Sequence, residues 1–160
     1  MRRLPLLFVL LATVAFVRTH VGSAMFVRPS SGSKGSHDAR VRKLTRRVVA
    51  YARHQIGVVY HWGGTSRRTG FDCSGLVYAA YRSIGLKIPR STWDQLRAGR
   101  PVRFAHLRPG DLVFTNGGGH VQLVVSRNAA ISAPQTDERV RYVPLARLRP
   151  EFAGARRLLR

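Results

Sequence analysis

The sequence predicts an α+β fold in which helices come first and an antiparallel sheet follows. Before residue 100, apolar residues recur at helical spacing, whereas after Pro109-Gly110 short β-branched runs alternate with turn residues. Helices and strands that are segregated in this way are typical of helices packed against one antiparallel sheet. The 160 residues suffice for one compact domain.

The first 24 residues have the pattern of an export signal. Arg2 and Arg3 precede an apolar run from Leu4 to Val17, and small residues at 22–24 offer a cleavage site. The run has about 14 residues, short of the roughly 20 that span a bilayer. We therefore expect a signal peptide at 1–24 and no stable membrane insertion after its removal. An uncleaved N-terminal anchor is the alternative.

The next segment, 25–38, is polar and rich in Gly and Ser, so we expect a flexible linker there. A folded domain is expected at 39–160. It begins with a helix over 39–56, where apolar residues share one face, and Gly57 is expected to end that helix.

Two further helices and a set of strands are expected downstream. A helix is predicted over 73–84 with Asp72 as its N-cap, and a short helix over 92–97 with Ser91 as its cap. Turn signals then separate strands predicted at 111–115, 120–125, 129–133 and 140–143. The last segment, 145–160, is basic and gives no clear pattern.

The chain is strongly basic, with 28 Lys and Arg against 7 Asp and Glu and a formal net charge of +21. A field of this sign attracts anions such as anionic cell-wall polymers or carboxylate-rich peptides. The arginines form no long basic block, so we expect no nucleic-acid partner. An arginine-rich coding bias explains the same composition equally well.

Cys73 is the only cysteine, and it lies where the second helix is predicted to begin. Unpaired backbone N–H groups and the helix dipole favour a thiolate there. His120 follows three glycines and opens a predicted strand, so it is a candidate base. A cysteine on a helix followed by a histidine on a strand is the order of papain-like hydrolases, and it predicts a cysteine peptidase. The alternatives are an inert buried thiol, or a base supplied by His61 or His106.

No metal site and no cofactor are expected. The histidines lack ligand spacing relative to the cysteine or the carboxylates. The glycines at 117–119 also lack the Gly-Lys-Ser/Thr ending of a phosphate-binding loop.

Five motifs, in order, resemble the NlpC-type (NlpC/p-sixty) papain-like cell-wall cysteine peptidases. They are Tyr60-His61-Trp62-Gly63-Gly64-Thr65, Phe71-Asp72-Cys73-Ser74-Gly75-Leu76-Val77, Ile88-Pro89-Arg90-Ser91-Thr92, Leu107 to Phe114, and Gly119-His120-Val121. The resemblance implies a papain-like NlpC fold and an endopeptidase that cuts peptidoglycan stem peptides, most often between D-glutamate and a diamino acid. It makes Cys73 the nucleophile and His120 the base. It also makes Tyr60, Asp72 and Ser74 the lining of the pocket for the N-terminal part of the stem peptide.

The family has a third polar residue that orients the imidazole, commonly His and sometimes Asn, Gln or Glu. By the family pattern this position falls on Ser132, whose hydroxyl can accept a hydrogen bond but carries no charge. A tight hairpin at 127–128 would instead place Gln135 opposite His120, so Gln135 is an alternative. The chain also departs from the family at Gln122, where Gly is usual, and at Val59, where Pro is common.

Together these observations predict a secreted peptidoglycan endopeptidase of the bacterial cell envelope, acting on stem peptides. Two other functions fit the same fold. One is a non-catalytic cell-wall-binding module, which the uncharged third position favours. The other is an amidase or acyltransferase that uses the same thiol.

Overall fold

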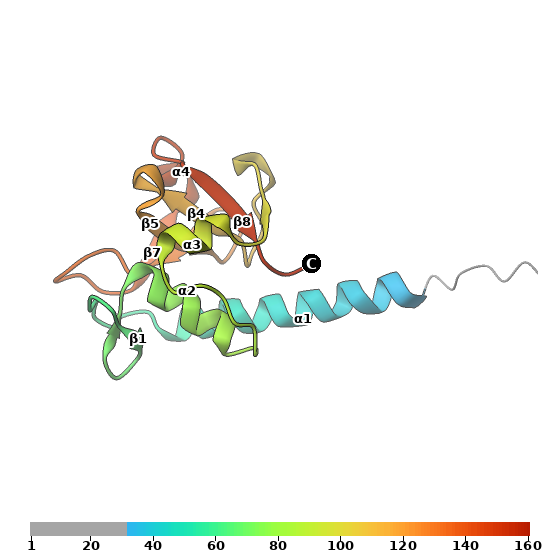
Figure 1. The fold of residues 1–160 in the computed structure, drawn as a ribbon, viewed down its shortest axis with the longest axis horizontal. Helices are drawn as coiled ribbons and strands as arrows, with labels where there is room; N and C mark the ends of the chain where they lie inside the picture. Colours follow the sequence, from blue (N-terminus) through green and yellow to red (C-terminus); the bar gives the residue numbers. More distant parts are fainter. Residues whose placement is uncertain (1–31) are drawn as a thin grey trace, which may run out of the picture. The chain divides into compact units, whose positions relative to one another are not determined.

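The computed structural model describes residues 32–160, with side chains from residue 34 onward. The expected signal at 1–24 and the start of the expected linker lie outside the described residues. A six-stranded antiparallel sheet forms the centre of the described domain (Figure 1). In sheet order its strands are β3 (Arg100–Pro101), β8 (Gly154–Arg157), β4 (Leu112–Thr115), β5 (His120–Val124), β6 (Ala129–Ser132) and β7 (Arg141–Pro144). The four strands predicted from the sequence correspond to β4, β5, β6 and β7.

The first helix, α1 (Gly32–His54), begins seven residues before its predicted start at Ala39. The segment 32–38, expected to be a flexible linker, is therefore helical. Its described side chains are exposed, and packing begins further along, where Val48 and Ala52 are fully buried. Once that part is fixed, each residue added upstream gains a backbone hydrogen bond without a new nucleation cost. No helix among the described residues combines the length and the apolar character that crossing a membrane requires.

Two shorter helices follow the prediction closely. In α2 (Cys73–Arg82), the side chain of Asp72 accepts a hydrogen bond from the Gly75 N–H at 2.6 Å. In α3 (Thr92–Arg97), the Ser91 hydroxyl accepts from the Asp94 N–H at 3.2 Å. Both caps satisfy N–H groups that a helix start leaves unpaired, so both predicted helices are confirmed.

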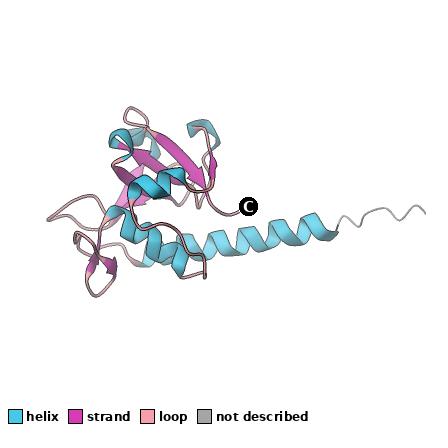
Figure 2. Ribbon diagram, in the orientation of Figure 1, coloured by secondary structure: helices cyan, strands magenta, loops and turns pink. Residues whose placement is uncertain are grey.

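The two faces of the sheet are covered by different helices (Figure 2). The larger core joins α1 and α2 to the face that carries Leu112, Phe114, Val121, Leu123 and Ile131. The smaller core joins the short helix α4 (Leu145–Leu148) to the face that carries Val113, Val124 and Ala130. Successive strand residues point to opposite faces, so these continuous apolar runs serve both cores.

The C-terminal segment, which gave no pattern in the sequence, contains α4 and β8. β8 lies between β3 and β4 and pairs with both in antiparallel fashion. Two small elements complete the part of the fold near the site: a hairpin of β1 (Thr65–Ser66) and β2 (Gly70–Phe71), and the 3-10 turn η2 (Asn116–Gly118) that precedes β5.

Candidate active site

The thiol of Cys73 lies at the first position of α2, and α2 packs against β5. The side chain is neither paired in a disulfide nor fully buried. Its sulfur lies 3.7 Å from the Thr92 hydroxyl oxygen, at the start of α3. A partly accessible thiol beside the unpaired N–H groups of a helix start is in a suitable position for nucleophilic attack.

The carboxylate of Asp72, next to Cys73 in the chain, is bonded at both oxygens by neighbouring donors. Arg90 binds it in bidentate fashion, with N···O distances of 3.0 Å to Oδ1 and 2.6 Å to Oδ2. Oδ1 also accepts from the Gly75 N–H and from the Ser74 hydroxyl at 3.2 Å, and Oδ2 accepts from the Gly63 N–H at 2.9 Å. We call Asp72, Ser74 and Arg90 the carboxylate clamp. It fixes three segments to one another: the turn at Gly63-Gly64, the start of α2 and the segment before α3.

The charge of the clamp is set by these contacts. Burial alone would raise the pKa of Asp72, but the hydrogen bond from Arg90, the Gly75 N–H and the positive charge of Arg90 more than offset it. The pKa of Asp72 is therefore below its ordinary value, and the group is ionised at neutral pH. Bidentate pairs of this kind are stronger and more directional than single contacts.

Gly75 is required because α2 begins against the glycine turn. A Cβ at this position would lie 2.0 Å from the Gly64 carbonyl oxygen. Any larger residue would push the turn away from the helix and separate the Gly63 N–H from Asp72. The Cys-Ser-Gly sequence thus places Cys73 two residues before the glycine that permits the close approach of the turn to α2.

His120 is the first residue of β5, and its Nε2 lies 2.8 Å from the Ser132 hydroxyl oxygen on β6. This contact leaves Nδ1 as the nitrogen available for proton exchange. Burial lowers the pKa of His120, because a low-dielectric environment disfavours the imidazolium. The ring is therefore neutral at pH 7, as a base must be before it accepts a proton.

The register of β5 and β6 explains why Ser132 and not Gln135 contacts the ring. The strands pair Leu123 with Ile131, and the Val125 N–H donates to the Ala129 carbonyl. The connection is thus a three-residue loop, and not the tight two-residue hairpin at 127–128 on which the alternative of Gln135 depended. When this register is continued, residue 134 lies opposite His120. Alternate residues of a strand point to the same face, so Ser132 lies on the same face of the sheet as His120. Gln135 falls on the other face, and the argument for it no longer holds.

Tyr60 is half-buried near Cys73. Burial raises the pKa of its phenol, and the nearby negative charge of Asp72 raises it further. The backbone of Tyr60 forms a bridge with Phe71, which brings it beside the start of α2. Ser74, by contrast, is buried, and its hydroxyl is occupied by the carboxylate clamp.

Two contacts at the site were not expected from the sequence: the pairing of Arg90 with Asp72 and the approach of Thr92 to Cys73. Both residues belong to a quoted family motif, but their partners lie 18 and 19 positions away in the chain. The sequence signal at this segment was the cap formed by Ser91, which is a local feature. Among the other histidines considered, His61 bonds to the Trp62 carbonyl at 3.0 Å, outside the catalytic contacts.

The family of the chain follows from its similarity to known proteins. Residues 57–154 match the NlpC/P60 family. The chain belongs to this family. The resemblance seen in the sequence and the fold that it implied are thereby confirmed.

Among relatives of this NlpC/P60 chain, the murein DD-endopeptidase MepH of Escherichia coli (strain K12) is 39% identical over 134 residues, which cover 78% of this chain and 49% of MepH. The peptidoglycan endopeptidase RipB of Mycobacterium tuberculosis is 34% identical over 143 residues, covering 79% of this chain and 59% of RipB. The gamma-D-glutamyl-L-lysine dipeptidyl-peptidase of Bacillus cereus is 39% identical over 112 residues, covering 65% and 33%. The chain thus spans from a third to about 60% of the length of these relatives.

The solved structure of the RipB peptidoglycan hydrolase matches with a TM-score of 0.70 and 32% identity. The match covers 84% of this chain and 74% of that chain. The arrangement of α1, α2 and the sheet is therefore shared with a peptidoglycan hydrolase.

Proposed function

We propose that this protein is a peptidoglycan endopeptidase that hydrolyses stem-peptide amide bonds with a cysteine–histidine mechanism. One observation carries the proposal: in a chain of the NlpC/P60 family, Cys73 begins α2 while His120, held by Ser132, begins the adjacent strand β5. A non-catalytic binding module would have no use for this pair.

In the proposed reaction, Cys73 transfers its proton to the neutral ring of His120, and the sulfur attacks the carbonyl carbon of the substrate amide. Backbone N–H groups at the start of α2 stabilise the oxyanion that forms. The imidazolium then protonates the departing amine, which leaves a thioester on Cys73. Water, deprotonated by His120, hydrolyses the thioester and restores the thiol.

We assign different roles to the three residues expected to line the stem-peptide pocket. Asp72 and Ser74 are buried and bonded to Arg90, so they shape the pocket wall and hold it rigid. Tyr60 is the accessible member, and we propose that its phenol contacts the substrate directly. Two exposed aromatic side chains, Trp62 and Trp93, are on segments next to the site and extend this accessible surface.

The bond that we propose is the one between D-glutamate and the diamino acid. The B. cereus relative is named for a γ-D-glutamyl-L-lysine bond, whereas MepH is named a DD-endopeptidase. Two substrates therefore discriminate: a purified stem tetrapeptide, and a dimer of tetrapeptides joined by a D,D cross-link. Cleavage of the tetrapeptide into two dipeptides is expected. An intact tetrapeptide with a cleaved dimer would assign the D,D bond instead.

The test of the proposed function is mass spectrometry of these substrates after incubation with the full chain and with its Cys73→Ala variant. We expect fragments whose total mass exceeds the substrate by one water. In the variant the rate should fall by at least about 10³-fold, because the nucleophile is removed. A product that carries an added acceptor would indicate acyl transfer. If both substrates stay intact while the protein still binds them, the binding-module function replaces the proposal.

We also propose that the protein is secreted and acts in the bacterial cell envelope, because its substrate lies there and residues 1–24 have the pattern of an export signal. Determination of the N-terminal residue of the extracellular protein tests this. A terminus close after Ala24 is expected, whereas an intact residue 1 in the membrane fraction would indicate an uncleaved anchor.

A further inference from the structure

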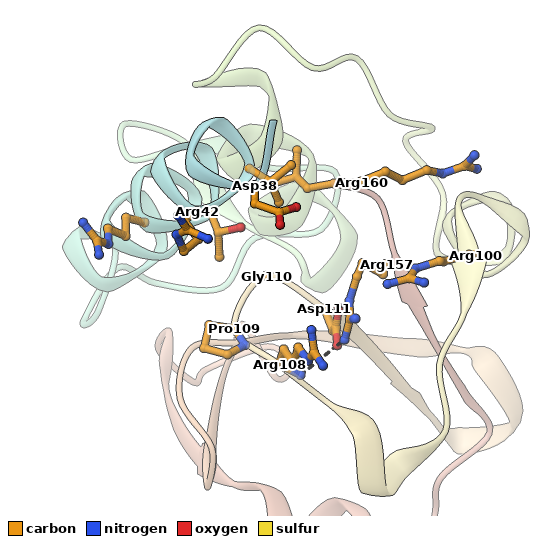
Figure 3. Close-up of a pocket in the computed structure, with 13 residues that line it drawn as sticks. Asp38, Arg42, Arg100, Arg108, Pro109, Gly110, Asp111, Arg157 and Arg160 are labelled. Atoms are coloured by element: carbon orange, nitrogen blue, oxygen red, sulfur yellow. Dashed lines mark hydrogen bonds and ion pairs between the residues drawn. The ribbon is translucent and has the colours of Figure 1, made fainter. Parts of the chain in front are cut away.

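A cavity of about 560 Å³ lies between α1, the turn at 108–111 and the segment that contains β8 (Figure 3). None of its lining residues belongs to the catalytic set described above. Six arginines line it, whereas the side-chain carboxylates that line it are only Asp38 and Asp111. The arginines are Arg42, Arg46, Arg100, Arg108, Arg157 and Arg160.

Only one of the six guanidinium groups is committed to a carboxylate within the described part of the chain. Arg157 binds Asp111 through two contacts of 2.6 Å, and Asp111 also accepts from the backbone N–H of Arg108 at 2.8 Å. The side chain of Asp111 is 1% exposed, so this pair belongs to the interior. The charge of Asp111 is therefore already neutralised by Arg157, and it forms no ion pair with the other arginines of the cavity.

The other five arginine side chains have neither a hydrogen bond nor an ion pair to any residue from 34 to 160. Asp38 approaches only His37, at 4.0 Å. Five guanidinium groups thus line one concavity against the single side-chain carboxylate of Asp38, which Figure 3 shows near Arg42 on α1, whereas Arg100 on β3 lies on the opposite side. Their mutual repulsion is relieved when an anion binds between them.

The wall of the cavity is held in place before any ligand binds. Gly110 has φ +89°, and a Cβ there would lie 3.2 Å from the methyl carbon of Thr45 on α1. The buried hydroxyl of Tyr81 donates to the Gly110 carbonyl oxygen. Burial raises the pKa of Tyr81, so this donor stays protonated. The backbone of the turn beside Arg108 is thereby fixed against α1 and α2, so the ordering that accompanies binding is confined to the exposed arginine side chains.

The chemistry of the lining selects among anions. The guanidinium groups come from α1, β3, the turn at 108–111 and the segment after β8, so they approach from several directions. A tetrahedral phosphate offers acceptors in several directions, whereas a carboxylate offers them in one plane. No aromatic side chain lines this cavity among the described residues, so it offers no platform for nucleic-acid bases.

We propose that this arginine-lined cavity binds the phosphate groups of a phosphodiester-linked polymer of the cell envelope. The location of that polymer rests on the proposed function, but the binding chemistry does not depend on the thiol. In this arrangement the polymer holds the enzyme at the wall while the catalytic residues act on peptides.

The test is isothermal titration of the full chain with poly(glycerol phosphate) as the probe. The triple variant Arg42→Gln/Arg100→Gln/Arg108→Gln is compared with the matched triple variant Arg68→Gln/Arg103→Gln/Arg147→Gln, which removes the same charge from exposed arginines outside the cavity. We expect the cavity variant to bind at least about tenfold more weakly, and the matched variant to stay within about twofold of the parent.

The other outcomes overturn the proposal. Equal weakening of both variants would mean that net charge alone attracts the polymer. If polygalacturonate binds equally well at the same charge concentration, the cavity binds polyanions in general and does not select phosphate. If phosphatidylglycerol vesicles bind in preference to the polymer, the ligand is a membrane surface. Hydrolysis of stem peptide by the cavity variant at the parental rate shows that it is folded, and it separates this test from that of the proposed function.

Discussion

The carboxylate clamp and the arginine-lined cavity use the same residue type in opposite ways. In the clamp, both oxygens of Asp72 are bonded, and the guanidinium group of Arg90 donates hydrogen bonds to Asp72, to Ser74 and to a backbone carbonyl. In the cavity, one arginine is committed to Asp111 and five are without a partner in the described domain. An arginine is structural where it has a buried carboxylate as a neighbour, and elsewhere its charge is available to a ligand. The net charge of the chain does not distinguish the two cases.

The largest effect is expected for Arg157, the committed arginine of the cavity. The change Arg157→Leu should lower the free energy of unfolding by about 3–5 kcal/mol, because it leaves the buried Asp111 without its counterion. Urea denaturation measures this. The neighbouring Arg156→Leu, which breaks no ion pair among the described residues, should change stability by less than about 0.5 kcal/mol. Equal values for the two variants would remove the distinction between structural and available arginines.

Arg90 should give the next largest effect. Its side chain is 37% exposed, so Arg90→Leu should destabilise the fold by about 1–3 kcal/mol, less than the change at Arg157. It should also lower kcat/KM for the stem peptide, because the pocket wall loses its support. Arg97→Leu breaks only the exposed pair with Asp94 and should cost less than about 1 kcal/mol. Parental kcat/KM in a folded Arg90→Leu variant would contradict a role for the clamp in the site.

The contact between His120 and Ser132 should give a smaller effect. Ser132→Ala removes one hydrogen bond, worth about 1 kcal/mol, so kcat/KM should fall by about fivefold. Such a loss identifies Ser132 as a positioning residue if the ring still titrates. A decrease as large as that of Cys73→Ala would give Ser132 a more direct role.

The pH profile tests the same contact in another way. The base must be neutral, and burial places the pKa of His120 below the ordinary 6.5, so activity should be lost only as the pH falls below that value. In Ser132→Glu a carboxylate beside the ring stabilises the imidazolium and raises its pKa by about 1 unit or more. The acid limb of kcat/KM should then move to higher pH. An unchanged limb would mean that His120 is not the titrating base.

The smallest effect on stability is expected for the available arginines. Arg42→Gln and Arg100→Gln break no contact in the described domain, so each should leave the free energy of unfolding within about 0.5 kcal/mol of the parent. A loss above about 1 kcal/mol from either change would show that these side chains, like Arg157, hold the fold together.

Local signals predicted a large part of the fold. Asp72 and Ser91 cap their helices as expected, because capping depends on residues three positions apart. The strand β8 was missed because Arg156 and Arg157 interrupt its apolar pattern. Arg157 is accommodated there only because Asp111, 46 positions away, lies beside it. An ion pair between residues so far apart in the chain cannot be detected from the local spacing of apolar residues.

The candidate site shows the same limit. Ser132 was identified through the family pattern, and Gln135 through an assumed loop length. One additional loop residue, at 126–128, reverses which side of β6 faces His120. Arg90 and Thr92 were visible as motif residues, but their partners depend on how α2 and α3 pack. The sequence motifs therefore indicated the segments that come together at the candidate site, but not which side chains contact one another there.

The position of β8 also determines when the domain can finish folding. The strand nearest the end of the domain lies inside the sheet, where it joins β3 to the rest of the strands. As a chain emerges from N- to C-terminus, the edge of β4 stays open and the charge of Asp111 stays uncompensated until residues 154–157 appear. The sheet thus closes in a late step, after the strands and helices around Cys73 have already emerged.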